Sequence, residues 1–94
     1  MTIDLTKILF SDDAPDEGRV QFYVEKIESG EALKRPVVYR QPDGMYGIID
    51  GHCRLEAARR RGATEVIAYV VEVATAGEIE TLRRKLNEHH WQGN

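Results

Sequence analysis

The chain lacks the features of a secreted or membrane protein. It has one cysteine among 94 residues, so no internal disulfide can form and a reducing compartment is expected. No apolar run is long enough to cross a bilayer, and residues 1–7 have no apolar core of the kind that a signal peptide needs. The sequence therefore predicts a cytoplasmic protein without a membrane segment.

Positive charge is not in excess either. The 13 Lys and Arg residues are outnumbered by 16 Asp and Glu residues, which gives a formal net charge of −3 and argues against a general basic surface for nucleic acid. A local exception is the run Arg59, Arg60 and Arg61, close to Arg54. This run lies at the end of a predicted helix, where cations are favoured by the dipole, so a structural role is expected before nucleic-acid contact.

What is present is a regular alternation of apolar patterns, in a chain with 41% hydrophobic residues. Strands are predicted over residues 3–10, 37–40, 45–49 and 66–73, and helices over residues 19–29, 52–61 and 75–89. Residues 11–18 are acidic and predict a loop, and the turn at residues 41–44 joins the middle strands in a hairpin. The last strand is nearly all apolar, which is typical of a strand covered on both faces.

This order predicts a small single-domain α/β protein with a mixed β-sheet and helices. The domain is expected over residues 1–75, and a C-terminal helix and tail over residues 76–94. That helix begins at a capping box, Thr75 with Glu78. Its one apolar stripe packs on the domain or on a second copy of the chain: Ile79, Leu82 and Leu86. The residues beyond it have no metal-ligand spacing and are interpreted as a frayed end: His89, His90 and Trp91.

The most informative segment is residues 48–58, in which an apolar strand stops at Asp50 and Gly51 and a helical pattern follows at once. A strand that turns sharply into a helix aims the free N–H groups of the helix at the space above the turn, and the helix dipole favours an anion there. Arg54 adds a cationic fork in the same place. The segment therefore predicts a phosphate-type site at Gly51, His52, Cys53 and Arg54.

Each residue of this segment also has a structural interpretation. Arg54 binds phosphate or pairs with Glu56 or Asp50. Asp50 caps the helix, or it is a ligand to Mg²⁺ that arrives with a nucleotide. Gly51 is required by the tight turn, because a side chain would block it.

His52 and Asp50 are the candidate catalytic residues. His52 donates to a phosphate or acts as a general acid or base, or it is an exposed first-turn residue. Cys53 lies near a helix N-terminus beside Arg54, so a lowered thiol pKa is expected. A half-buried packing role is the alternative for Cys53.

The chain resembles the ParB/sulfiredoxin superfamily over residues 19–73. The resemblance rests on the motif segments 49–58, 61–63 and 66–71, with Ile27, Gly30 and residues 36–39 at fitting positions upstream. It implies that residues 51–54 bind the phosphates of a nucleotide (ATP, ADP or CTP), together with Mg²⁺. Within the superfamily, ParB-type proteins bind a cytidine nucleotide at this turn, sulfiredoxins bind ATP, and free-serine kinases transfer a phosphoryl group.

The sequence departs from each of these groups. His52 and Cys53 stand in the reverse of the sulfiredoxin order, the ParB-type Asn-Pro-x-Gln box is absent, and the chain ends before a helix-turn-helix could follow. The residue sequence of the turn is closest to that of the free-serine kinases. Those enzymes bring extra acidic elements, and four acids are comparable here: Asp12, Asp13, Asp16 and Glu17.

The resemblance and the turn together predict a ParB-like nucleotide-binding domain, either as a binding module or as a slow hydrolase or phosphotransferase. Whether the chain is an enzyme stays open. The alternative is a non-enzymatic regulatory or DNA-associated module of the partition or plasmid-control type, which acts through a protein partner or a homodimer formed by the last helix and binds DNA weakly alone. A third hypothesis is thiol chemistry at Cys53.

Overall fold

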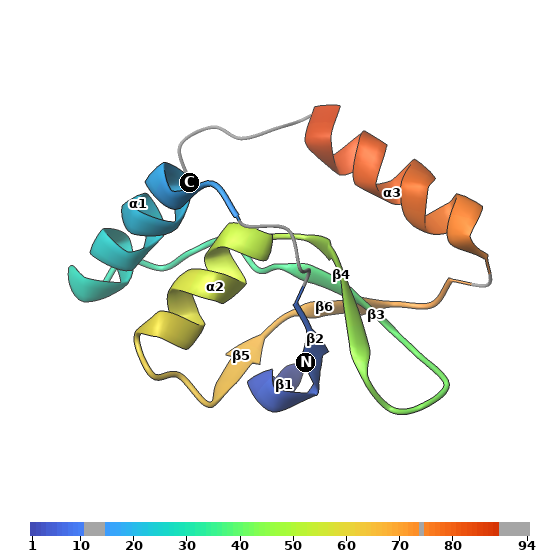
Figure 1. Ribbon diagram of the computed structural model, residues 1–94, viewed down its shortest axis with the longest axis horizontal. Coiled ribbons are helices and arrows are strands. Elements are labelled where there is room, and N and C mark those ends of the chain that lie inside the picture. The colour runs from blue at the N-terminus through green and yellow to red at the C-terminus, as the bar shows by residue number, and fades with distance from the viewer. Residues whose placement is uncertain (11–14, 74, 89–94) are drawn as a thin grey trace.

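The computed structural model describes residues 1–10, 15–73 and 75–88, which form a small α/β fold (Figure 1). A four-stranded mixed sheet has the order β2-β4-β3-β6, and β1 and β5 form a separate antiparallel pair. The elements in chain order are β1 (Thr2–Asp4), the 3₁₀ turn η1 (Leu5–Lys7), β2 (Ile8–Leu9), α1 (Glu17–Glu28), β3 (Val37–Arg40), β4 (Tyr46–Asp50), α2 (His52–Arg60), β5 (Glu65–Ile67), β6 (Tyr69–Val71) and α3 (Ala76–Glu88).

The sequence predicts one continuous strand over residues 3–10, and this prediction is wrong. Asp4 Oδ1 accepts hydrogen bonds from the Thr6 N–H at 2.8 Å and the Thr6 hydroxyl at 2.7 Å, and this local cap turns the chain into η1. The segment is therefore divided between β1, which pairs with β5, and β2, which runs parallel to β4. Both pieces still turn apolar side chains into the core, with Ile3 and Ile8 buried.

The strand predicted over residues 66–73 is also divided, and it is not covered on both faces. Ala68 is fully buried between β5 and β6, and its N–H donates to the Met1 carbonyl at 2.8 Å, while the next N–H, of Tyr69, donates to Pro36 at 2.9 Å. The chain thus changes partner strand at Ala68. Ile67 is 51% exposed and Tyr69 57% exposed, so each side of the break has one open face.

The hairpin of β3 and β4 forms as predicted and supplies the centre of the sheet. β4 lies between β2 and β3, with parallel pairing to the first and antiparallel pairing to the second. Gly47 stands opposite Tyr39, and a Cβ at Gly47 would come within 2.2 Å of the Tyr39 ring. The glycine therefore lets an aromatic ring lie flat over the central strand.

The helices occupy two places. α1 and α2 pack against each other and are drawn side by side in Figure 1, whereas α3 stands apart and contacts β4. α1 begins two residues before the predicted start because Asp16 Oδ1 caps it, accepting from the Arg19 N–H at 3.2 Å. The predicted loop over residues 11–18 therefore ends earlier, and residues 11–14, with Asp12 and Asp13, lie outside the described residues.

α2 and α3 begin and end close to the predicted residues. α2 ends at Arg60, and Gly62, whose φ is +83°, follows the C-cap residue Arg61. Thr75 Oγ1 accepts from the Glu78 N–H at 3.2 Å, which is one half of the predicted capping box, and Arg83 Nη2 donates to the Ile48 carbonyl at 2.8 Å. Of the two predicted partners of α3, the one that the structure shows is the domain, at β4. His89, His90 and Trp91 lie outside the described residues.

Two apolar clusters make up the core. One joins β1, β2, β3 and α2 and contains Ile3, Leu5, Ile8, Val38, Leu55 and Ala68. The other lies between α1 and α2 and contains Val20, Tyr23 and Ala57, with Cys53 packed against it. In the described part of the chain, no helix is long and apolar enough to cross a membrane.

Candidate functional site: the start of helix α2

The site begins at Gly51, the residue between β4 and α2. Its φ is +98°, a left-handed conformation that suits glycine, and no side chain among the described residues forms a capping hydrogen bond to this helix. The first regular bond runs from the Leu55 N–H to the Gly51 carbonyl at 2.9 Å. The N–H groups of the three residues between them precede the internal bonding of the helix, and they carry the positive end of its dipole.

Glycine is also required at position 51 by close packing. A Cβ there would lie 2.7 Å from Pro36 Cβ and 3.0 Å from Pro36 Cα, both shorter than ordinary contacts. It would lie 3.2 Å from Arg54 Nη2 as well. The predicted reason for this glycine is confirmed, and the Arg54 guanidinium is placed directly beside the turn.

The prediction that Asp50 caps α2 is wrong. Its carboxylate accepts a hydrogen bond from Arg54 Nη2 at 2.8 Å instead, and the N-cap position of α2 is occupied by Gly51. The Arg54 side chain is 9% exposed and that of Asp50 29% exposed. Of the predicted structural partners of Arg54, Asp50 is the one that the structure shows.

One nitrogen of Arg54 lacks a hydrogen-bond partner in the part of the chain that the structure describes. Nη1 is buried and makes no hydrogen bond within the described residues. A buried N–H donor without an acceptor is unfavourable by about 1–3 kcal/mol. The guanidinium is therefore held at the turn by Asp50 with part of its donor capacity unused.

The start of α1 contacts the site at Cys53. The Asp16 N–H donates to the Cys53 sulfur, and the side chain is half-buried against α1. Burial raises the pKa of the Cys53 thiol above its ordinary value, which outweighs the lowering effects of that hydrogen bond and of Arg19 and Arg54. The expected lowering of this pKa is wrong, because removal of the thiol from water is the larger effect.

Tyr23 is a member of this site that the sequence interpretation missed. The residue is 3% exposed, and burial raises the pKa of its phenol, an effect that Arg54 and Arg19 oppose electrostatically. Its only signal in the sequence is its place on the apolar face of a predicted helix, which does not distinguish a core residue from one beside a buried cation. Arg19 was likewise assigned to a helix without a role.

His52 lies on the other side of the turn, half-exposed, with its ring centroid 6.1 Å from that of Phe10. Phe10 also lies under the Arg59 guanidinium, at 4.1 Å from its centroid. The structure therefore places His52, partly exposed, at the first residue of α2 and against Phe10. No group of three or more His, Cys, Asp or Glu residues that could hold a metal occurs among the described residues.

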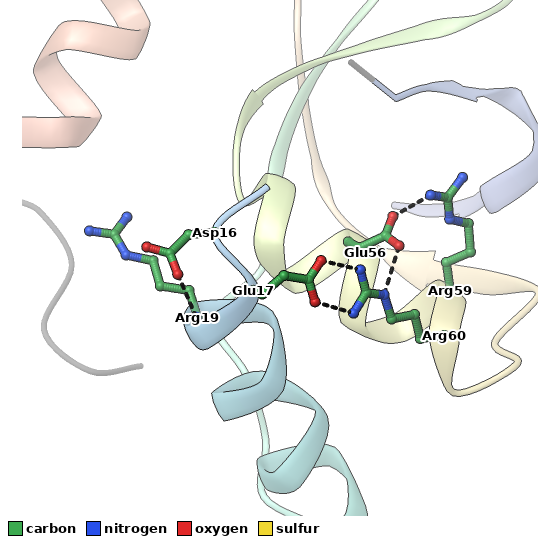
Figure 2. Close-up of polar contacts among 6 residues, drawn as sticks. All are labelled: Asp16, Glu17, Arg19, Glu56, Arg59 and Arg60. Carbon is green, nitrogen blue, oxygen red and sulfur yellow. Dashed lines mark hydrogen bonds and ion pairs between the residues drawn. The ribbon is translucent and has the colours of Figure 1, made fainter. Parts of the chain in front are cut away.

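The predicted basic run on α2 is neutralised by acids, in line with its predicted structural role. Glu56, which is 7% exposed, pairs with Arg59 and with Arg60, the latter at 2.9 Å, and Arg60 also forms two bonds of 2.8 and 2.7 Å with Glu17 (Figure 2). Arg61 pairs with Glu28 at 3.5 Å. Each of the three arginines therefore faces a carboxylate.

The chain has a ParB/sulfiredoxin-like fold, as the sequence resemblance implies. The chromosome-partitioning protein ParB from Caulobacter crescentus, C-terminally truncated and complexed with CTP-γ-S, matches with a TM-score of 0.71 and 22% identity, over 90% of this chain and 51% of that chain. The same protein complexed to the centromeric parS site gives a TM-score of 0.62 and 19% identity, over 88% and 44%.

Sulfiredoxin from Arabidopsis thaliana is similar at nearly its full length. Its TM-score is 0.65 at 20% identity, over 87% of this chain and 96% of that chain. The chain thus spans about half of each ParB structure and almost all of the sulfiredoxin. No protein-family model and no curated protein sequence matches the chain.

Proposed function

We propose that the domain binds a nucleotide through its phosphates at the start of α2. The observation that carries this proposal is the glycine-led helix start without a side-chain cap, with the partly unsatisfied Arg54 guanidinium beside it. Backbone N–H groups at a helix N-terminus together with a cationic fork form a favourable place for phosphate oxygens. The similar ParB structure with CTP-γ-S supports a nucleotide as the ligand, and CTP is tested first, with ATP and ADP beside it.

A magnesium ion would come with the nucleotide. The donor set fits that mode, since the Asp50 carboxylate lies at the turn beside Arg54 and Mg²⁺ needs just one or two carboxylates when phosphates supply other oxygens. Asp50 would then share its carboxylate between Arg54 and the ion. Mg²⁺ would neutralise the phosphate charge, and the protein's part is to place Asp50 and the helix start on one side of it.

Binding is tested by isothermal titration with CTP, ATP and ADP, with and without Mg²⁺. Arg54→Ala should abolish the affinity for the nucleotide that binds, whereas Arg61→Ala, which removes the same charge from the far end of α2, should keep it. Circular dichroism must show that both variants are folded. Equal affinity of wild type and a folded Arg54→Ala protein contradicts the proposal.

Turnover is a separate proposal, carried by His52 at the first residue of α2. A general acid or base must lie within reach of the proton that it transfers, and the partly exposed His52 imidazole stands at the start of this helix. Phosphate release from CTP and ATP is measured for wild type and His52→Ala. Binding without release in the wild type would leave a nucleotide-binding module and remove the enzymatic role.

A DNA-associated or partner-dependent role is the second candidate. The similarity to the parS-bound ParB structure favours it, but the ion pairs of Arg59, Arg60 and Arg61 leave little free positive charge on α2 for phosphates. DNA contact would therefore depend on a protein partner or on a homodimer through α3. Sedimentation with and without duplex DNA, over a range of salt concentrations, decides both points.

A further inference from the structure

Glu56 is a buried carboxylate that the proposed phosphate site does not use. Its two oxygens go to different arginines of the same helix: Oε1 accepts from Arg59 and Oε2 from Arg60 Nε at 2.9 Å. Figure 2 shows Arg60 between Glu56 and Glu17, with Arg59 on the other side of Glu56. Because Glu56 is 9% exposed in its side chain, it is tightly oriented, and it fixes the directions of both guanidinium groups.

The two arginines hold the two sides of the connection between β2 and α1. Arg60 binds Glu17, the first residue of α1, through both carboxylate oxygens. Arg59 lies over the ring of Phe10, the residue after β2. One carboxylate therefore fixes two segments that are separated in sequence by residues 11–16.

Both held segments contact the first turn of α2. Phe10 packs against His52 with ring centroids 6.1 Å apart, and Asp16, next to Glu17, donates its N–H to the Cys53 sulfur. His52 and Cys53 are the first two residues of α2, where the proposed phosphate position lies. The position of each neighbour thus depends on a contact made more than one turn farther along the helix.

We propose that Glu56, acting through Arg59 and Arg60, is a positioning residue that holds Phe10 and the start of α1 against the first turn of α2 and so shapes the nucleotide site. The inference rests on the proposed function for its effect on affinity, but its mechanical part can be measured without a nucleotide. Glu56→Gln disturbs both arms, because it removes the negative charge that both guanidinium groups face and leaves one acceptor oxygen for the two of them. Arg59→Ala releases the Phe10 arm alone, and Arg60→Ala releases the α1 arm alone.

The only cysteine of the chain reports the α1 arm. Cys53 is half-buried under the start of α1, so this cover limits the rate of its alkylation by iodoacetamide. Glu56→Gln, Arg60→Ala and Glu17→Gln should each raise the rate at least about fivefold. Arg59→Ala and the matched control Arg61→Ala, whose partner Glu28 lies at the other end of α1, should leave the rate unchanged.

The His52 ring reports the Phe10 arm. Its carbon-bound protons should shift in the NMR spectra of Glu56→Gln and Arg59→Ala, because the neighbouring aromatic ring moves, and should not shift in Arg60→Ala or Arg61→Ala. The proposal requires Glu56→Gln to act on both reporters. A folded Glu56→Gln protein that changes neither reporter, or only one, overturns it.

Affinity then tests the effect on the site, with CTP and ATP as the probes. Glu56→Gln should weaken the binding that wild type shows by roughly tenfold, and Arg61→Ala should not. Unchanged affinity in a Glu56→Gln protein with both reporters moved overturns the role at the site. If wild type binds neither nucleotide, the proposed function fails and the effect on affinity fails with it, while the two reporters still decide the mechanical part.

Discussion

Arg54 Nη2 and Asp50 Oδ2 lie 2.8 Å apart and join the last residue of β4 to the first turn of α2. A cation in the first turn of a helix opposes the dipole, and the Asp50 carboxylate offsets that effect. The same pair keeps the guanidinium at the turn, with Nη1 buried and unbonded among the described residues. The Arg54 side chain therefore takes part both in a structural ion pair and in the candidate anion site.

Arg54→Ala should lower the free energy of unfolding by about 2–4 kcal/mol, because it removes a buried side chain and leaves Asp50 without its cation. Arg54→Lys should recover only part of this loss, since an ammonium cannot reproduce the fork of the guanidinium. Urea denaturation at pH 7 measures both variants. An Arg54→Ala protein within about 0.5 kcal/mol of wild type would show that the pair contributes little.

Gly51→Ala should be among the most harmful glycine substitutions in the chain. The positive φ of +98° and the 2.7 Å approach to Pro36 Cβ act together, so a loss of about 2–4 kcal/mol is expected. Gly62→Ala is the matched control: its φ is +83°, but nothing lies within 4 Å of its Cβ position. It should lose only about 1 kcal/mol. Equal losses in thermal denaturation would contradict the close contact with Pro36.

The sequence predicted the α2 turn well because its determinants are local. A strand that ends at Asp50, a glycine at 51 and a helical pattern from His52 are all consecutive in the chain. The hairpin was predicted for the same reason. The predicted capping role of Asp50 was wrong, since Gly51 takes the N-cap position and the Asp50 carboxylate bonds to Arg54.

The errors in the strands and at Cys53 come from long-range contacts. Residues 66–73 read as one strand, and only the hydrogen bonds of Ala68 and Tyr69 to distant carbonyls divide it. The Cys53 pKa was judged from its neighbours in sequence, whereas burial under α1 determines it. Of the two acids that neutralise Arg60, Glu56 lies at helical i,i+4 spacing, whereas Glu17 could not be chosen from spacing because it lies 43 residues away.

Cys53 should react slowly near neutral pH. Burial raises the pKa of its thiol, so the thiolate fraction at pH 7 is smaller than that of a free cysteine. The rate of alkylation by iodoacetamide should still be rising above pH 9. A rate that levels off below pH 8 would indicate a lowered pKa, and thiol chemistry at this position would then need to be considered again.

Glu17 should make the free energy of unfolding of the domain depend on pH in the acidic range. The Arg60 guanidinium, which bonds to both of its oxygens, holds the pKa of Glu17 below its ordinary value of 4.5. A carboxyl group whose pKa is lower in the folded state stabilises the fold above its unfolded pKa, and this contribution is lost as the pH falls through the folded pKa. The wild type should therefore lose stability below about pH 4.5.

Glu17→Gln tests this dependence, because the amide cannot titrate. Its free energy of unfolding should be lower than that of wild type at pH 7, and the difference should shrink as the pH is lowered from 5 to 3. Glu28→Gln is the matched control, since Glu28 faces Arg61 across a longer 3.5 Å contact and should change the acid dependence less. A difference between wild type and Glu17→Gln that is constant over this range would mean that the Glu17–Arg60 contact stabilises the fold by packing, and not through its charge.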